Sequence, residues 1–337
     1  TVGTSSSYNN TDFINGYSSY SFPSKPWYTC RDGLYGSNKY GQIQTYTYNV
    51  PTALKTVNIT DATRIADGAF NFCLNITRIT LNDGVTSIGK ATFQRCTVLN
   101  NYAIPNNVTV IGEFAFNGDT ALAEIYIPNG VTKVEPYTFY ECNRISRLVV
   151  SKNVSSIGEY AFYGNSALTK LVIPEKATSI GSYAFANCTG ITTINIPDKV
   201  TSLGTYVFSG DNKVTSLSIG SGVRTIPSYA FQNCSGLTTI TVPDTVTGIN
   251  EFAFAGCNNV TSITLPFVGA SRTATGPSAH FGYIFGYTKS LVTSDATGSY
   301  TRTLYRPLGS SYESFSQSYT VGTSSSYNNT DFINGYS

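Results

Sequence analysis

Cysteine is the residue type whose spacing in this sequence most suggests chemistry. Six of the seven cysteines share one position of a 23-residue period. They are Cys73, Cys96, Cys142, Cys188, Cys234 and Cys257. Thiols can bind metals, form disulfides or act as nucleophiles. The sequence has no CxxC pair and a single histidine, so the spacing does not indicate a metal site.

Small polar residues replace cysteine where the series is interrupted. Asp119, Asn165 and Asp211 occupy the skipped positions. A position shared by Cys, Asn and Asp is best explained by a side chain that hydrogen-bonds backbone groups at a turn. We therefore expect a structural ladder of side chains inside a stack of repeats.

Disulfides are the competing interpretation for two neighbouring pairs. Cys73 could face Cys96, and Cys234 could face Cys257, at a separation that a disulfide accepts. The other two cysteines of the series lie between Asp or Asn positions and cannot pair in this way. Buried free thiols throughout the array are the favoured interpretation. Cys30 lies outside the array and could be free or intermolecular.

The groups needed for catalysis are scarce. The only histidine, His280, lies in a probable capping segment, and no GxSxG, HExxH, Walker or dinucleotide motif is present. Acidic residues such as Glu113, Glu159 and Asp198 are scattered over variable loop positions. The LPFVG string at 265–269 completes a repeat and is interpreted as structural. We expect no enzymatic activity, no cofactor and no bound metal.

A constant 23-residue period must position all of these residues. Phenylalanine marks it nine times without insertion or deletion, at Phe70, Phe93, Phe116, Phe139, Phe162, Phe185, Phe208, Phe231 and Phe254. So short a unit cannot bury a hydrophobic face alone, which predicts a solenoid of stacked coils. Alternation at Leu168, Leu171 and Ile173 predicts one strand per coil, and the Ile-Gly pair predicts a tight turn.

The repeated phrase L-x-x-I-x-I-P-x-x-V-T-x-I-G-x-x-A-F-x-x-C resembles the BspA-like class of leucine-rich repeats. The resemblance covers about two-thirds of the chain. It implies a mainly β, right-handed solenoid with a parallel β-sheet, on secreted or surface-attached proteins that commonly function in adhesion. It implies no catalytic residues.

The composition divides the chain into four segments. A Tyr/Ser-rich joint and cap is expected over 1–52, the solenoid over 53–269, and a Tyr/Gly-rich cap and joint over 270–319. Residues 320–337 repeat 1–18 without a change. In the flanks, the TYTYNV strand (45–50) should cover the first coil. The strand-favouring FGYIFGY (281–287) should cover Phe254, Ile263 and Leu265.

Outward-facing strand positions provide the candidate binding residues. Because successive side chains of a strand point to opposite faces, the predicted strands leave two columns of outward-facing residues along the stack. The charged residues of these columns lie in the early coils. Glu124, Tyr126, Arg147 and Lys170 are the best candidates for a ligand site. The alternative is that these residues only solvate an exposed sheet.

The identical ends and the composition suggest assembly of copies of this chain. Charged residues are only 12% of the chain, and its net charge is +2, so binding to nucleic acid is not expected. The sequence has no run of about 18 apolar residues, so a membrane span is not expected either. Our main hypothesis is an extracellular or cell-surface structural protein, one period of a covalent tandem array or of a head-to-tail filament. The alternative is an adhesin whose solenoid face binds a host protein or glycan.

Glycosylation sequons are permissive and not diagnostic. The total, with Asn328 included, is close to the number that chance would give in so Ser- and Thr-rich a chain. The other sites are Asn9, Asn58, Asn75, Asn107, Asn153, Asn187, Asn233 and Asn259.

Overall fold

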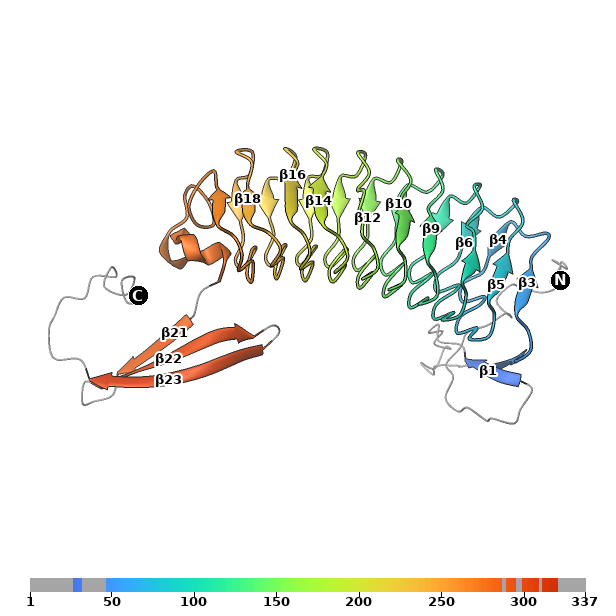
Figure 1. The fold of residues 1–337 in the computed structure, drawn as a ribbon, viewed down its shortest axis with the longest axis horizontal. Coiled ribbons are helices and arrows are strands. Elements are labelled where there is room, and N and C mark those ends of the chain that lie inside the picture. The colour runs from blue at the N-terminus through green and yellow to red at the C-terminus, as the bar shows by residue number, and fades with distance from the viewer. Residues whose placement is uncertain (1–26, 32–46, 287–288, 295–298, 309–310, 321–337) are drawn as a thin grey trace, which may run out of the picture. The chain divides into compact units, whose positions relative to one another are not determined.

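The computed structural model describes residues 27–31, 47–286, 289–294, 299–308 and 311–320. The chain divides into two compact units, Thr1–Phe285 and Gly286–Ser337. In the first unit the described residues form a mainly β solenoid whose coils stack in chain order (Figure 1). The predicted solenoid class is therefore confirmed.

Each coil except the one at 168–173 contributes one short strand to a first series of parallel strands, which we call ladder A. Its strands are β3 (Thr56–Asn58), β5 (Arg78–Thr80), β7 (Asn101–Tyr102), β9 (Glu124–Tyr126), β11 (Arg147–Val149), β14 (Thr193–Ile196), β16 (Ser216–Ile219), β18 (Thr239–Thr241) and β20 (Ser262–Thr264). Where two of these strands pair, each residue lies opposite the residue 23 positions later in the sequence, as Glu124 does with Arg147. At the half-repeat the offset is 22, where Thr56 pairs with Arg78.

A second parallel series, ladder B, lies where the sequence predicted only a tight turn. Its two-residue strands are β4 (Arg64–Ile65), β6 (Ser87–Ile88), β8 (Val110–Ile111), β10 (Lys133–Val134), β12 (Ser156–Ile157), β13 (Ser179–Ile180), β15 (Ser202–Leu203), β17 (Thr225–Ile226) and β19 (Gly248–Ile249). Two residues are too few to display the period of a strand, which explains why the pattern did not reveal them.

Ladder A is discontinuous, which corrects the expected strand at Leu168, Leu171 and Ile173. Burial alternates there as in a strand, but ladder A has no strand between β11 and β14. Phe rings of adjacent coils stack at 5.2 to 5.7 Å, more than the usual strand separation of about 4.8 Å. The ring spacing does not decide where ladder A breaks, because β14 and β16 pair where the rings are 5.6 Å apart. At 168–173, where no strand forms, the rings are 5.3 Å apart.

The core is a column of Phe rings at the turn of each coil. From Phe93 to Phe254 these side chains are fully buried. Main-chain amides on this side donate to the following coil, as Phe116 N–H does to the Thr138 carbonyl at 2.9 Å. Each coil therefore satisfies both the apolar face and the polar backbone of its neighbour.

The end of the stack is covered by two short 3-10 helices, η2 (Gly276–Ala279) and η3 (Phe281–Ile284). The Phe254 N–H donates to the Ile284 carbonyl at 2.9 Å, where other coils use the next repeat. Ile284 is fully buried against the core. The strand expected for FGYIFGY is wrong over 281–284, because β propensity reflects fit to a pleated surface and this segment closes on itself instead.

The remaining strands lie in antiparallel sheets. β1 (Trp27–Arg31) pairs with β2 (Thr47–Pro51), and Val50 packs against the core. The second unit contains β21 (Lys289–Ser294), β22 (Ser299–Leu308) and β23 (Ser311–Thr320), in that order in one sheet. Residues 1–18 and 321–337 lie outside the described residues, so most of the repeated ends are not placed.

We predict that Phe162→Ala lowers the free energy of unfolding by about 3–5 kcal/mol, through lost burial and a residual cavity. The Phe162 ring is fully buried and lies 5.3 Å from the rings of both Phe139 and Phe185. Equilibrium urea unfolding measures the change, with the exposed Thr239→Ala as the control. A loss below about 1 kcal/mol would contradict a core built on this column.

Candidate interaction surface

The cysteine ladder is a set of hydrogen-bond donors inside the stack. All six array cysteines are free and buried. The Cys96 thiol donates to the Phe70 carbonyl at 2.9 Å, and the Cys142 thiol to the Phe116 carbonyl at 2.9 Å. The same bond, spanning 26 residues, recurs at 3.2 Å from Cys188, Cys234 and Cys257 to Phe162, Phe208 and Phe231. The thiols therefore satisfy core carbonyls. The state of the Cys30 side chain lies outside the described residues.

Asparagine and aspartate fill this position differently. Asn165 Nδ2 donates to the carbonyls of Phe139 and Phe162, at 3.0 and 2.8 Å. Asp119 is fully buried, and its Oδ1 accepts from the Cys96 N–H at 2.7 Å, while Oδ2 has no partner. A carboxylate cannot donate, so only the protonated acid can serve a carbonyl as Asn165 does. Burial raises the pKa of Asp119 and of Asp211 well above the ordinary value.

We predict that Asp119→Asn stabilises the protein at neutral pH. The pKa of Asp119 is raised in the folded state, so the folded chain holds a proton that the unfolded chain has lost above about pH 4. The free energy of unfolding therefore falls as pH rises from about 4 towards the folded-state pKa. The variant lacks this fall because its amide does not titrate. The gain should be about 1 kcal/mol or more near pH 7 and shrink towards pH 4.

Thermal melts across this pH range measure the effect. Asp198→Asn is the matched control, because Asp198 is exposed and the Ser221 amide, 2.7 Å away, lowers its pKa. Its replacement should not stabilise the protein at neutral pH. An unchanged pH dependence in the Asp119 variant would show that this carboxyl is not protonated in the fold.

Three of the four candidate ligand residues contact one another on ladder A. The Tyr126 hydroxyl donates to Glu124 Oε2 at 2.9 Å, and Arg147 Nη1 lies 3.9 Å from the same oxygen. The Arg147 guanidinium lies 5.2 Å from the centre of the Tyr126 ring. The hydrogen bond to Glu124 raises the pKa of Tyr126. Lys170 is exposed one coil further on, where the strand is missing, and is not brought into the cluster by any described contact.

Exposed apolar side chains lie beside these charges, a feature that the sequence analysis undervalued. Tyr126, Val149 and Val172 follow one another on the outward face of consecutive coils and are 46%, 43% and 57% exposed. We call these three residues the apolar strip. The sequence shows their 23-residue spacing and predicts their outward position, but each residue was interpreted only as one position of an exposed column.

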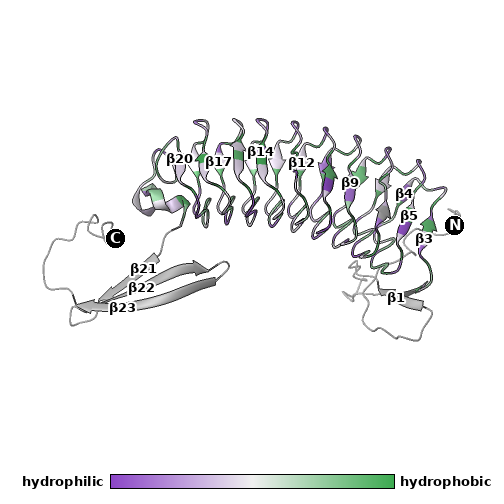
Figure 2. Ribbon diagram, viewed as in Figure 1, coloured by the Kyte–Doolittle hydropathy of each residue, from purple (hydrophilic) through white to green (hydrophobic). Residues whose placement is uncertain are grey.

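Later coils carry short polar side chains at the equivalent positions. Thr193, Asn195, Thr239, Thr241 and Thr264 are all exposed. Figure 2 shows the contrast with early strands such as β5, which carries strongly hydrophilic positions. The outward face therefore changes character along the stack, from charged and apolar to hydroxyl-rich.

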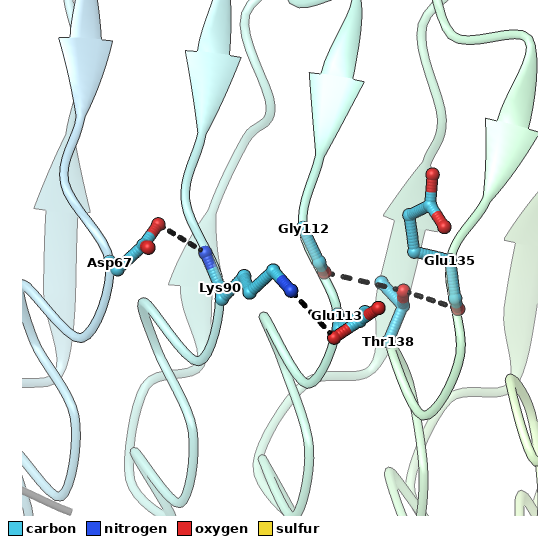
Figure 3. A network of polar contacts seen from close by, with 6 residues as sticks. All are labelled: Asp67, Lys90, Gly112, Glu113, Glu135 and Thr138. Atoms are coloured by element: carbon cyan, nitrogen blue, oxygen red, sulfur yellow. Dashed lines mark hydrogen bonds and ion pairs between the residues drawn. The ribbon is translucent and has the colours of Figure 1, made fainter. Parts of the chain in front are cut away.

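A second charged group lies at the turn that follows ladder B (Figure 3). The Asp67 carboxylate accepts from the Lys90 main-chain N–H at 2.8 Å, and Lys90 Nζ lies 2.9 Å from Glu113. The bond to Glu113 raises the pKa of Lys90. Both side chains of the ion pair are more than a third exposed, and surface pairs of this kind contribute little to stability. The group links three neighbouring turns.

The sequence also missed a second aromatic column. Phe114, Tyr137, Tyr160, Tyr183, Tyr206, Tyr229 and Phe252 stack ring on ring along one side of the coils. All seven adopt a left-handed backbone conformation with φ between 53° and 60°, which is uncommon for residues other than glycine. The 23-residue step at this position was a sufficient signal to find them.

The glycosylation candidates differ in accessibility. Asn58 is exposed on β3, and Asn75 is partly buried. The amide nitrogens of Asn107, Asn153, Asn187 and Asn259 donate to neighbouring coils at 2.8 to 2.9 Å. Asn233 follows the left-handed pattern of its turn, with φ 59°. Asn9 lies outside the described residues.

The residues that the structure describes form neither a metal centre nor a membrane-spanning helix. No group of three or more His, Cys, Asp or Glu side chains is placed to hold a metal ion. Within the same part of the chain, no helix has the length and hydropathy required to span a membrane.

The fold and the ladders define a leucine-rich-repeat solenoid. Residues 41–169 and 155–272 match the family described as BspA type leucine rich repeat region, in 6 copies. The match spans well over half of the chain, which therefore belongs to this family. Among curated proteins there is no match.

Several solved structures are similar to this chain. The T. pallidum leucine-rich-repeat protein TpLRR is 26% identical, with coverage of 48% of this chain and 78% of that one and a TM-score of 0.46. A leucine-rich cell surface protein of Faecalibacterium prausnitzii is 19% identical, with coverage of 80% and 94% and a TM-score of 0.33. A Bacteroides ovatus leucine-rich-repeat protein is 19% identical, with coverage of 73% and 89% and a TM-score of 0.41.

Proposed function

We propose that this protein is a non-enzymatic surface protein that binds another protein through the apolar strip. The observation that carries the proposal is the strip itself. Only six large hydrophobic side chains are exposed among those the structure describes, and three of them form this continuous column. Contiguous exposed apolar residues with a polar rim are typical of interaction sites, whereas isolated ones are ordinary surface.

The stack makes the strip rigid before it binds. Tyr126 and Val149 lie on β9 and β11, which pair in register as Tyr126 with Val149. The Arg147 guanidinium contacts the Tyr126 ring, and Glu124 accepts a hydrogen bond from its hydroxyl. Little side-chain freedom remains to be lost on binding, which favours affinity.

The chemistry of the strip favours a protein ligand over a glycan. Two of its three residues are valines, which offer no aromatic face for a sugar ring and no hydrogen bond to its hydroxyls. Arg147 and Lys170 border the strip, and Glu124 is already engaged by Tyr126 and Arg147. A complementary partner would present aliphatic side chains flanked by an acidic residue, with Lys170 as the available cation.

An extracellular or cell-surface location is part of the same proposal. It is supported by the BspA-type repeats and by the low charge of a hydroxyl-rich chain. The array thiols do not argue against it, because they are buried in the core as hydrogen-bond donors.

We predict that Val149→Ser with Val172→Ser weakens binding at least tenfold, about 1.4 kcal/mol, because hot-spot contacts of this kind are lost. The purified chain would be tested against immobilised extracellular-matrix proteins and against a glycan array. The matched control is Thr241→Ala with Thr264→Ala, at the same outward column of later coils. Equal loss in both variants, or binding to glycans alone, would contradict the proposed surface.

Assembly into a fibre is a second candidate function, supported by the identity of 1–18 with 320–337. An exact copy at the two ends fits a unit that recurs along a tandem or head-to-tail array. Low charge suits close packing, because few ions must be desolvated at the contacts.

We predict that deletion of residues 1–18 abolishes this assembly and leaves the strip able to bind. Electron microscopy of native material and of the deletion variant measures it. Isolated particles in both samples would exclude the fibre, whereas rods lost only in the variant would support it.

A further inference from the structure

The aromatic column contains five tyrosines in unbroken succession. Tyr137, Tyr160, Tyr183, Tyr206 and Tyr229 follow one another at 23-residue steps, between Phe114 and Phe252. None of the five side chains belongs to the sealed core, since all are partly exposed. Their hydroxyls are chemically reactive groups for which the proposed binding role has no use.

The rings lie face to face and close. Successive centroids are 4.9, 4.6, 4.5 and 4.4 Å apart along the column, with planes within 12° of parallel. The Phe rings of the core stack at 5.2 Å or more. The tyrosine column is therefore the more tightly spaced of the two, and Tyr206 with Tyr229 is its tightest pair, with planes 4° apart.

We propose that this column is a site of oxidative cross-linking, in which neighbouring coils become joined by dityrosine. Two phenoxyl radicals form the new bond between the ring carbons next to their hydroxyls, and face-to-face rings bring those carbons together. The repeated left-handed backbone, with φ of 57° at Tyr206 and 60° at Tyr229, gives each ring the same direction, so the register is the same at every step.

The reaction requires an oxidant from outside, of the peroxidase type with hydrogen peroxide. Each of two neighbouring phenols gives up one electron and its hydroxyl proton. The radicals pair to form one carbon–carbon bond, and the hydrogen on each bonded carbon then moves to the oxygen, which restores both phenols. One hydrogen peroxide is reduced to two waters for each cross-link.

The surroundings of the phenols suit this step. Burial raises the pKa of Tyr160 to about 12, so the phenol stays protonated at neutral pH and must release its proton with its electron. Burial likewise raises the pKa of Tyr183. The phenylalanines at both ends lack a hydroxyl and end the column as a coupling site. Tyr140 and Tyr163 lie beside it, with tilted rings 5.5 Å or more from those of Tyr137 and Tyr160.

The test treats the dilute, full-length chain with peroxidase and hydrogen peroxide, followed by digestion and mass spectrometry of cross-linked peptides. We expect intrachain dityrosine joining Tyr206 to Tyr229 or to Tyr183, with the mass lowered by two hydrogens. Tyr206→Phe should abolish both of these peptides while the Tyr160–Tyr183 link persists. Its stacking is preserved, as Phe114 and Phe252 show at the equivalent position.

Two further variants keep the outcome interpretable. Tyr102→Phe removes a phenol whose hydroxyl is buried off the column, with its ring against Phe93 and Phe116, and should leave the cross-links unchanged. Phe114→Tyr extends the column, since its ring lies 4.7 Å from that of Tyr137, and should add a new link between these two positions. Circular dichroism confirms that each variant is folded. Cross-links confined to tyrosines outside the column, or an equal yield of column links in a urea-unfolded chain, would overturn the proposal.

Discussion

No coil of this protein can exist without its neighbour, because 23 residues are too few to bury an apolar face or to pair their own backbone. Rings, carbonyls and amides all find partners one coil away. The bond from a ladder side chain such as Cys142 or Asn165 to a Phe carbonyl, 26 residues earlier, is the clearest case. At the last coil, Ile284 in η3 supplies the carbonyl that a further repeat would have given.

This constraint explains which substitutions the repeat tolerates. The ladder position needs a donor, so Cys and Asn serve directly, and Asp serves only when it carries a proton. At residues 168–173 ladder A has no strand, yet the ring column continues through that coil at 5.3 Å. The core rings are therefore the more regular of the two features.

The period, the Phe column and the donor role of Cys142 and its equivalents could be predicted from sequence because each recurs at one fixed step. Ladder B could not, because two-residue strands leave no alternation to detect. η3 was missed because its aromatic composition is typical of strands, while its real partners are the orphaned amides of the last coil. Glu124, Tyr126 and Arg147 were predicted from sequence as candidate ligand residues, and Val149 and Val172 as outward positions. The contacts among the first three and the exposed fractions of the two valines required coordinates.

The stack presents its outward residues in fixed register, and the account therefore depends on whether partners bind the early coils in particular. Site-specific photo-cross-linking tests this directly, with a photoreactive phenylalanine analogue placed at position 172 or at position 241 of the full chain. The account predicts covalent adducts with a bound partner protein from position 172 and few or none from position 241. Adducts from position 241 alone, or equal adducts from both, would contradict a binding surface centred on the apolar strip.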